Sequence, residues 1–219
     1  ERRQADIPFT IISMSGSKYL ADQLYSICSF FVNAGMPQKW IVFSDGSYTA
    51  EERSLLSKIP FVEVRDIHTN KYDIDKAYFD QYPLLKKLAA YSQLSIDSTT
   101  ILTDSDILFF PAFKKYESVF SAHNWYLADE DRFYFDDDYL VENNADMYGT
   151  NTGFIVLNTK PDWSIATNYI FNKLMNKNPF GHWSEQTAIH LMIRQAQDFL
   201  PLDPRKFVLS GKDSFKISV

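Results

Sequence analysis

The first half of the chain alternates short apolar runs with segments whose apolar residues recur at helical spacing. Four apolar runs predict buried strands, at 9–14, 40–44, 61–64 and 99–103. Between them, the pattern predicts helices at 17–34, from 49 onward and at 82–94. Strands that alternate with helices are typical of a parallel sheet with right-handed crossovers. The expected fold class is therefore α/β, with a mostly parallel central sheet flanked by helices.

Local signals refine two of these helices. The helix expected at 17–34 has one apolar stripe, formed by Leu20, Leu24, Ile27 and Phe31. Gly35 ends this helix, and Cys28 inside it is expected to be a core thiol. Thr49 is expected to cap the next helix, because acidic residues follow it in the first turn.

The second half has a different pattern. An acidic and aromatic loop is expected at 129–138, and the segment Asn151-Thr152-Gly153 leads into an apolar strand at 154–157. Helices are expected at 163–175 and at 185–194, the latter capped by Ser184. Because no repeat or linker divides the chain, we expect a single domain over 1–219, with a nucleotide-binding half at about 8–110 and a substrate-binding half at about 111–219.

The tetrapeptide Thr103-Asp104-Ser105-Asp106 is the most informative motif, because it places two acids in an otherwise apolar run. In an extended chain, positions i and i+2 project to the same side. Two like charges there cost several kcal/mol unless a positive partner compensates them. A divalent cation that carries a diphosphate is such a partner. The alternative interpretation is a strand-ending turn with solvated acids.

Three polar turns are expected at the same edge of the sheet. They are the turn Ser13-Met14-Ser15-Gly16, Asp45 after the second strand, and Asp104. Ligands of open parallel sheets bind beyond the carboxyl ends of the strands. The arrangement therefore predicts a nucleotide pocket at this edge.

Composition narrows the class of partner. The chain of 219 residues has a formal net charge of −6, which argues against a nucleic-acid surface. Its 45% hydrophobic and 16% aromatic content suffices for a packed core. No apolar run is long enough for a transmembrane helix. The polar start without Met suggests a trimmed fragment, and the lone cysteine with no signal peptide slightly favours a cytoplasmic location.

These motifs, in this order and spacing, resemble the GT-A glycosyltransferases, and most closely the family 8 group and its relatives. The resemblance rests on the Asp-x-Asp near position 100, the Asn-x-Gly of Asn151 and Gly153, and an acid-Gln pair at Glu185 and Gln186. It implies the GT-A fold and transfer of a sugar from a nucleotide-sugar, usually a UDP-sugar, to an acceptor that the sequence does not specify. It also implies Mn²⁺ or Mg²⁺ on the diphosphate.

The same resemblance implies roles for individual residues. Asp106 would coordinate the metal, and Asp104 would share the metal or hold sugar hydroxyls. Four residues would surround the nucleotide, and they are Ser13, Tyr19, Asp45 and Lys86. Tyr19 would stack on uracil. Lys86 forms a pair with Lys87 on a helix, where a solvated charge is the ordinary interpretation of such lysines.

Around the donor sugar, the resemblance implies that Asn151 and Gly153 line the site and that Glu185 and Gln186 lie beside the anomeric carbon. An inverting enzyme would use Glu185 as its base. A retaining one, which family 8 implies and which we favour, would use the pair to orient the donor. Many relatives also take a metal ligand from a C-terminal His, and only Gly211 and Lys212 of that element are present here.

Each of these residues also has an ordinary structural interpretation: Tyr19 as a half-buried helix residue, Asp45 as a turn residue before Gly46, and Glu185 as helix first-turn charge. Two other functions stay open. One is a degenerate domain that binds a nucleotide-sugar or glycan without turnover. The other is a haloacid-dehalogenase-type phosphatase, which is less favoured because position 108 is Leu and three strands precede the motif.

Overall fold

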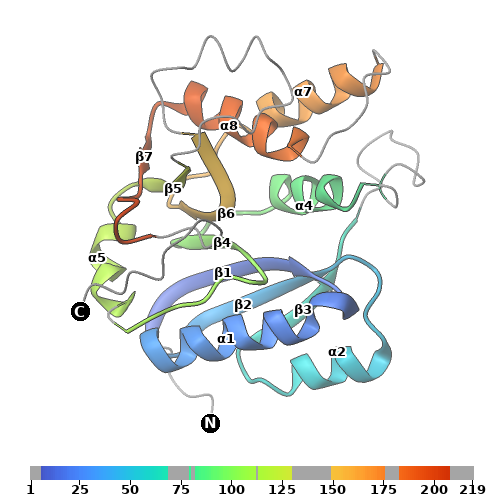
Figure 1. The fold of residues 1–219 in the computed structure, drawn as a ribbon, viewed down its shortest axis with the longest axis vertical. Coiled ribbons are helices and arrows are strands. Elements are labelled where there is room, and N and C mark those ends of the chain that lie inside the picture. The colour runs from blue at the N-terminus through green and yellow to red at the C-terminus, as the bar shows by residue number, and fades with distance from the viewer. Residues whose placement is uncertain are drawn as a thin grey trace.

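A computed structural model of the chain describes residues 6–68, 79, 82–111, 113–129, 149–175 and 183–207. Their strands form one seven-stranded sheet in the order β3-β2-β1-β4-β6-β5-β7 (Figure 1). The strands are β1 (Ile7–Ser15), β2 (Pro37–Ser44), β3 (Val62–Asp66), β4 (Thr100–Asp104), β5 (Asn124–Asp129), β6 (Gly149–Leu157) and β7 (Phe199–Pro201). β1 to β4 run parallel, whereas β6 is antiparallel to both of its neighbours. The predicted α/β class with a mostly parallel sheet is confirmed.

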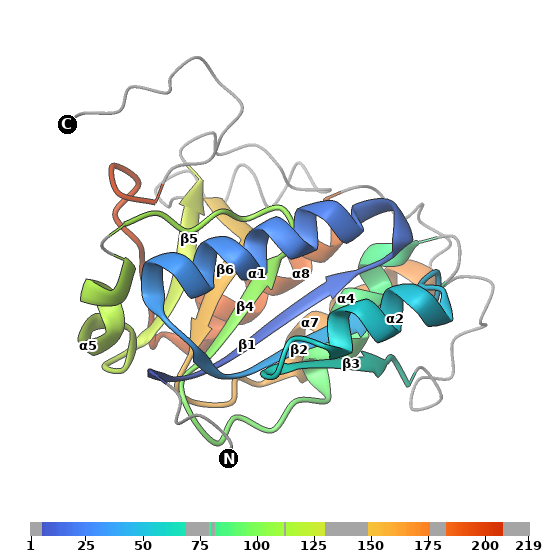
Figure 2. The same cartoon turned by 90° about the horizontal axis from the view of Figure 1, so that it is seen from below.

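Helices cover both faces of the sheet. The helical elements are η1 (Ser17–Tyr19), α1 (Leu20–Ala34), α2 (Ala50–Ser57), α4 (Pro83–Ser92), η2 (Phe113–Tyr116), α5 (Glu117–Phe120), α7 (Trp163–Met175) and α8 (Ser184–Ala196). α1 and α2 lie on one side of the sheet, and α4, α7 and α8 lie on the other (Figures 1 and 2). Each side has its own hydrophobic core, and the core beneath α1 is rich in aromatic rings. The sheet thus separates two cores and leaves its strand ends accessible.

The buried face of α1 differs from the predicted stripe. Its buried residues are Gln23, Ser26, Ile27, Phe30 and Ala34. Phe31 is exposed, and so is Cys28, which corrects the expectation of a core thiol. The helix can turn Gln23 inward because the Ser13 hydroxyl donates to Gln23 Oε1 (2.7 Å) and accepts from Trp40 Nε1 (3.0 Å). Two aligned hydrogen bonds offset the burial of these polar groups.

Of the two predicted N-caps, the one of α2 is confirmed and the one of α8 is wrong. Thr49 is the N-cap of α2 as predicted, and it also forms a capping box with Glu52. Ser184 is not a cap, because α8 begins at Ser184 itself and the cap position is Trp183, whose side chain makes no capping bond. Pro83 opens α4 as expected.

Two strands of the structure, β5 and β7, were not predicted. β5 and β7 are short strands whose mixed sequences, NWYLAD and FLP, carry no period-two signal. The apolar run after the two acids is not strand, because β4 ends at Asp104. In that run Phe109 is buried whereas Leu108 and Phe110 are exposed.

Candidate functional site

The carboxyl ends of the parallel strands form the predicted edge. β1, β2 and β4 are neighbours that end at Ser15, Ser44 and Asp104. β6 runs the other way, so its first residues lie at the same edge. Thr103 pairs with Phe154 in the β4–β6 ladder, which brings Asp104 beside Gly153. The edge therefore collects residues from both halves of the chain.

Gly153 is packed against two of the predicted site residues. A Cβ atom placed on Gly153 would lie 2.8 Å from Asn151 Oδ1 and 3.1 Å from Asp104 Oδ2. The Asn151 Oδ1 atom also accepts the Gly153 backbone N–H at 2.8 Å. Asn151, Gly153 and Asp104 are thus brought together, and only a residue without a side chain fits between the two oxygens.

A buried lysine joins this group, and it is Lys87 rather than Lys86. The Lys87 ammonium donates to Asp104 Oδ1 at 2.7 Å and lies 3.4 Å from Glu185 Oε1. It also lies 3.3 Å from both the backbone oxygen and the hydroxyl of Thr152. Only 3% of Lys87 is exposed, so the expectation of a solvated charge is wrong.

Glu185 lies behind Asp104 in the same network. Its Oε2 atom accepts the Thr152 hydroxyl at 3.0 Å, and the residue is buried in the first turn of α8. Gln186, the next residue, is buried as well. Glu185 faces a lysine from α4 and a threonine from β6, so three elements meet at this carboxylate.

Burial and charge compete in setting the pKa values of this network. Burial by itself would lower the pKa of Lys87, but the carboxylates of Asp104 and Glu185 raise it above its usual range. Burial raises the pKa of Glu185, and the Lys87 charge and the Thr152 hydroxyl oppose that rise. Lys87 is therefore a permanent cation that holds two acids from distant parts of the chain.

Asp106 differs from Asp104 because it is exposed and has no cationic partner among the contacts that the structure describes. Partial loss of solvent raises the pKa of Asp106, and repulsion from Asp104 and Asp22 raises it further. The Asp104 Oδ2 atom likewise accepts no hydrogen bond from the described residues, since Lys87 binds Oδ1. Asp104 Oδ2 and the Asp106 carboxylate thus remain available at the edge.

These two acids fit part of a divalent-cation site. Hard cations take oxygen ligands, and the repulsion around Asp106 would be relieved by a bound cation. Among the described residues no group of three His, Cys, Asp or Glu side chains could hold a metal alone. Further ligands would have to come from a bound phosphate, from water or from parts of the chain beyond those described.

The other side of the edge is formed by Asp45 and its neighbours. Asp45 Oδ1 accepts the Ser47 backbone N–H at 2.8 Å and the Ser47 hydroxyl at 2.6 Å. A Cβ atom on Gly16 would lie 2.2 Å from Asp45 Oδ2, so the carboxylate rests directly on that glycine. The Lys86 ammonium donates to the Asp45 backbone oxygen at 2.8 Å. Asp45 and Lys86 are therefore brought together at the end of β2.

Tyr19 and Ser13 occupy contrasting positions. Tyr19 is exposed at the start of α1, with the Lys18 ammonium 5.0 Å from its ring centroid. Ser13 is fully buried, and its hydroxyl is used by Gln23 and Trp40. Tyr19 is available to a ligand, whereas the Ser13 side chain supports the packing of α1.

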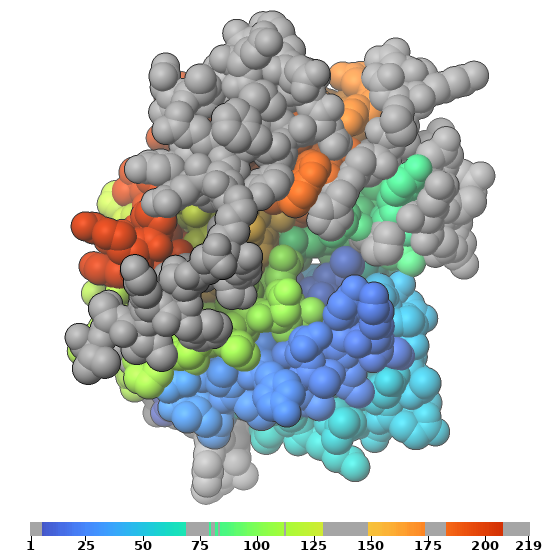
Figure 3. Space-filling view, viewed as in Figure 1, coloured from blue at the N-terminus to red at the C-terminus, as the bar shows by residue number. Residues whose placement is uncertain are grey.

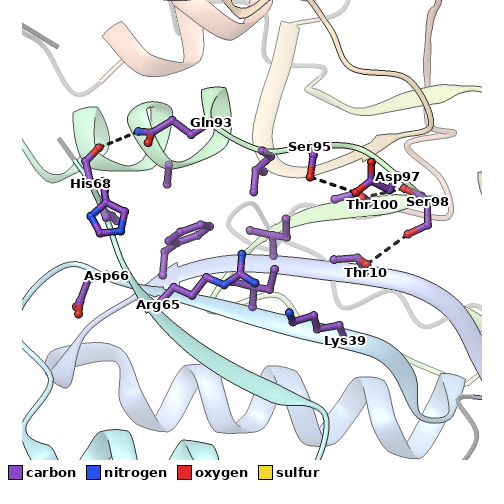
Figure 4. A pocket seen from close by; sticks show the side chains of 16 residues that line it. Thr10, Lys39, Arg65, Asp66, His68, Gln93, Ser95, Asp97, Ser98 and Thr100 are labelled. Carbon is purple, nitrogen blue, oxygen red and sulfur yellow. Dashed lines mark hydrogen bonds between the residues drawn. The ribbon is translucent and has the colours of Figure 1, made fainter. Parts of the chain in front are cut away.

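A separate cavity of about 640 Å³ lies on the α4 side of the sheet (Figure 4). Its floor includes Ile12, Ile41 and Leu94, and its rim carries Lys39, Arg65, His68 and Asp97. None of the predicted site residues lines it. Lys39 and Arg65 on this rim share the Glu63 carboxylate as their ion-pair partner.

Comparisons with known proteins address the fold. No protein-family model and no curated protein matches the sequence. The structure resembles the galactosyltransferase LgtC in complex with donor and acceptor sugar analogs, with a TM-score of 0.59, 10% identity, and coverage of 90% of this chain and 74% of the other. It also resembles mouse xyloside xylosyltransferase 1, with a TM-score of 0.57, 14% identity, and coverage of 90% and 85%. The chain has the GT-A fold.

A third neighbour shares the fold. Core-mannan synthase A from Aspergillus fumigatus, solved in an Mn/GDP form, matches with a TM-score of 0.54, 11% identity, and coverage of 92% of this chain and 74% of the other. The Asp-x-Asp comes at the end of the fourth strand of a mixed sheet, and none of the structures named here supports the phosphatase alternative. No helix among the described residues is long and apolar enough to cross a bilayer.

Some expectations lie outside the described residues. They are the loop at 129–138, apart from the end of β5, and the C-terminal element with Gly211 and Lys212. Lys87 and Thr152 were not selected from the sequence. The spacing of Lys87 from Tyr91 and Leu94, which are buried four and seven positions later, was the available signal for a buried lysine.

Proposed function

We propose that the chain is a glycosyltransferase that moves a sugar from a nucleotide-sugar, with a UDP-sugar as the donor, to an acceptor. The observation that carries the proposal is the convergence of Asp104, Gly153 and Glu185 around Lys87 at the edge where GT-A folds expose their strand ends. Sugar transfer needs a site that holds a diphosphate and a developing positive charge on the sugar. At this edge Asp104 and Asp106 supply negative charge, and the buried Lys87 behind them supplies positive charge.

Mn²⁺ or Mg²⁺ would be held by Asp106 and by Asp104 Oδ2, the two carboxylate groups left available at the edge. When bound, such an ion acts as a Lewis acid that stabilises the diphosphate leaving group. Lys87 supports this role because it occupies only Oδ1 of Asp104 and fixes the direction of the carboxylate. A relative solved with Mn and GDP supports the choice of a divalent cation.

The nucleotide would lie toward β1 and β2. Tyr19 offers an exposed ring for the base, and Asp45 offers its carboxylate to the base or ribose. Lys86 orders the backbone of the Asp45 turn. Ser13 would not contact the nucleotide with its side chain, because its hydroxyl is hydrogen-bonded to Gln23 of α1 in the core. It would instead support the position of α1 beside the nucleotide.

The donor sugar would lie between Asp104 and β6, beside Asn151 and Gly153. Glu185 is enclosed by Lys87 and Thr152, which favours an orienting and electrostatic role over proton abstraction from an acceptor. Gln186 follows it on the same helix turn. We therefore favour retention of the anomeric configuration, and NMR of the product sugar tests it, because an inverted product would contradict this assignment.

The decisive experiment is thermal unfolding with UDP and Mn²⁺. We expect the wild-type chain to be stabilised only when both are present, by roughly 3 kcal/mol at a hundredfold excess over the dissociation constant. Asp106→Ala should abolish this shift while leaving the unfolding temperature without ligand unchanged or higher, because a repelled charge is removed. Asp97→Ala, which removes an exposed acid at the other end of the β4 region, is the matched control. Unchanged UDP affinity in Asp106→Ala would refute the site.

Slow hydrolysis of a UDP-sugar then separates an enzyme from a binding module. The wild-type chain should release free sugar with Mn²⁺, and Asp106→Ala should not. Metal-dependent UDP binding without any hydrolysis or transfer would instead support the degenerate binding domain.

A further inference from the structure

The cavity of about 640 Å³ on the α4 side of the sheet lies apart from the two acids of the strand-end edge (Figure 4). Thr100, which lines the cavity, begins β4, whereas Asp104 ends that strand. The sheet separates the cavity from α1, which Figure 3 shows in blue on the near face, beside the green segment that follows β4. Its volume is within the usual range of small-molecule sites, so it is large enough for a ligand of its own.

An apolar floor with a cation on either side forms the sheet wall of this cavity. Ile41 and Phe43 of β2 form part of the floor and belong to the core on the α4 side. Lys39 lies two positions before Ile41, so it faces the same side of the sheet. Arg65 pairs with Phe43 across β2 and β3 and also lines the cavity.

These two cations have one carboxylate between them. Arg65 Nε donates to Glu63 Oε1 at 2.5 Å, and the Lys39 ammonium forms an ion pair with Glu63 Oε2. The Arg65 hydrogen bond, more than any other contact, lowers the pKa of Glu63 to about 2, so this carboxyl group is ionised and cancels one of the two positive charges. Among the described residues, the two Nη groups of Arg65 have no partner.

The other acids of the cavity do not cancel the remaining charge. Asp66 forms an ion pair with Arg53. Asp97 is exposed, accepts the Ser95 hydroxyl at 3.2 Å, and lies at the end of the hollow opposite Asp66 and His68 (Figure 4). The wall formed by β2 and β3 therefore keeps one positive charge in excess, and the free fork of an arginine suits a phosphate or carboxylate group.

Hydroxyl groups gather at one end of the cavity. The hydroxyl oxygens of Thr10 and Ser98 are 3.4 Å apart, which is longer than the usual hydroxyl bond of about 2.8 Å and leaves both able to bind another partner. The Thr100 hydroxyl donates to the Ser98 backbone oxygen at 2.9 Å and can still accept a hydrogen bond. Figure 4 shows these three side chains close together. Groups that donate and accept suit the hydroxyls of a sugar, whereas a fatty anion would leave them without partners.

We propose that this cavity is a second ligand site, for a small sugar that carries one anionic group. Its phosphate or carboxylate would meet Arg65 and Lys39, its ring would lie over the apolar floor, and its hydroxyls would meet Thr10 and Ser98. Sugar phosphates and hexuronates share this chemistry. The site is independent of the proposed transfer reaction, because it shares no residue with the strand-end edge.

Isothermal titration calorimetry of the whole chain, without UDP or Mn²⁺, tests the proposal. The probes are glucose 6-phosphate, glucuronate, glucose and inorganic phosphate. We expect at least one of the two anionic sugars to bind, and glucose and inorganic phosphate to bind at least about tenfold more weakly, because each of them meets only part of the site. Tighter binding of glucose 6-phosphate identifies a phosphate as the anionic group, and tighter binding of glucuronate identifies a carboxylate.

Substitutions test each end of the cavity. Arg65→Gln should weaken binding of the anionic sugar by about tenfold, while Glu63 keeps Lys39 as its partner. Arg205→Gln, which removes an exposed arginine that also pairs with a nearby acid, is the matched control and should bind as the wild type does. Thr10→Val keeps the shape of the side chain. It should weaken binding of the sugar by about fivefold and leave binding of inorganic phosphate unchanged. Lys39→Gln provides a second charge variant should Arg65→Gln unfold the chain.

Four results would overturn the proposal. They are no binding of either anionic sugar at millimolar concentration, equal losses in Arg65→Gln and Arg205→Gln, inorganic phosphate that binds as tightly as the sugars, and displacement of the sugar by UDP with Mn²⁺. The last result would place the sugar at the strand-end edge. The thermal shift with UDP and Mn²⁺, measured on the same samples without sugar, reports the proposed function separately.

Discussion

Asp45, directly after β2, and Asp104, at the end of β4, lie at the same edge of the sheet, yet they are held in different ways. Asp45 is fixed by a turn of its own, through Ser47 two residues later, and it rests on Gly16. Asp104 is fixed by Lys87, which also contacts residues 65 positions and more along the chain, in β6 and α8. The proposed nucleotide side of the site is thus held mainly by a turn, whereas the proposed sugar side depends on one buried cation that joins the two halves.

Replacing that cation gives the largest expected effect. Lys87→Met should destabilise the chain by about 3–5 kcal/mol, because it leaves Glu185 buried without its partner. Lys86→Met, the adjacent control, should cost no more than about 1.5 kcal/mol for its hydrogen bond to Asp45. Urea unfolding measures both. Adding Glu185→Gln to Lys87→Met should recover part of the lost stability. Equal losses of stability for Lys87→Met and Lys86→Met would contradict the inference that only Lys87 joins the two halves of the chain.

Low pH should lower the free energy of unfolding, because His190 in the second half of the chain is buried in its neutral form. This side chain is buried, with Nδ1 2.9 Å from the Thr150 hydroxyl, and burial followed by the charge of Arg194 lowers its pKa to about 4. The unfolded chain binds the proton near its ordinary value of 6.5, so stability is present above 6.5 and is lost as the pH falls toward 4. The loss approaches ~3 kcal/mol.

Urea titrations at several pH values measure this slope. His190→Gln, which keeps a polar group near Thr150, should flatten it across that window. A slope that the variant leaves unchanged would show that other groups dominate the acid response.

The two glycines test the two sides directly. Gly16→Ala should cost about 1–3 kcal/mol, because the new methyl group displaces the Asp45 carboxylate from Ser47. It should keep the dependence of UDP binding on Mn²⁺. Gly153→Ala should cost less stability but weaken that dependence, since its methyl group meets Asp104 Oδ2. Calorimetry with UDP and Mn²⁺ measures the metal dependence of both variants. Loss of this dependence in Gly16→Ala but not in Gly153→Ala would contradict the proposed placement of the metal beside Asp104.

The smallest effect is expected from removing the N-cap of α2, Thr49, whose capping bonds are all with Glu52. Thr49→Ala removes the side-chain half of the α2 capping box and should cost about 1 kcal/mol. Thr49→Ser should retain nearly all of the stability, because Ser accepts the same Glu52 N–H. Neither variant should change UDP binding. A change in affinity would show that the cap also shapes the nucleotide side.

Much of the fold followed from periodicity. The first four strands, the α2 cap and the placement of Asp45 and Asp104 at one edge could be predicted, because these features depend on neighbouring residues and on the geometry of parallel strands. The short strands β5 and β7 could not, since their side chains are sorted by contacts with β6 and with each other rather than by a repeating pattern. The prediction for the α1 stripe failed because a hydrogen bond from the Ser13 hydroxyl allowed Gln23 to face inward.

The sequence by itself determined that two acids would stand at the end of a buried strand, at the ligand-binding edge of an α/β sheet. Only the tertiary structure decided which of two adjacent lysines would form an ion pair with Asp104. Lys86 and Lys87 are identical in chemistry and differ by about 100° around one helix. The packing of α4 against β6 and α8 turns Lys87 inward and leaves Lys86 toward Asp45. That choice depends on contacts between residues far apart in the chain, which local sequence does not encode.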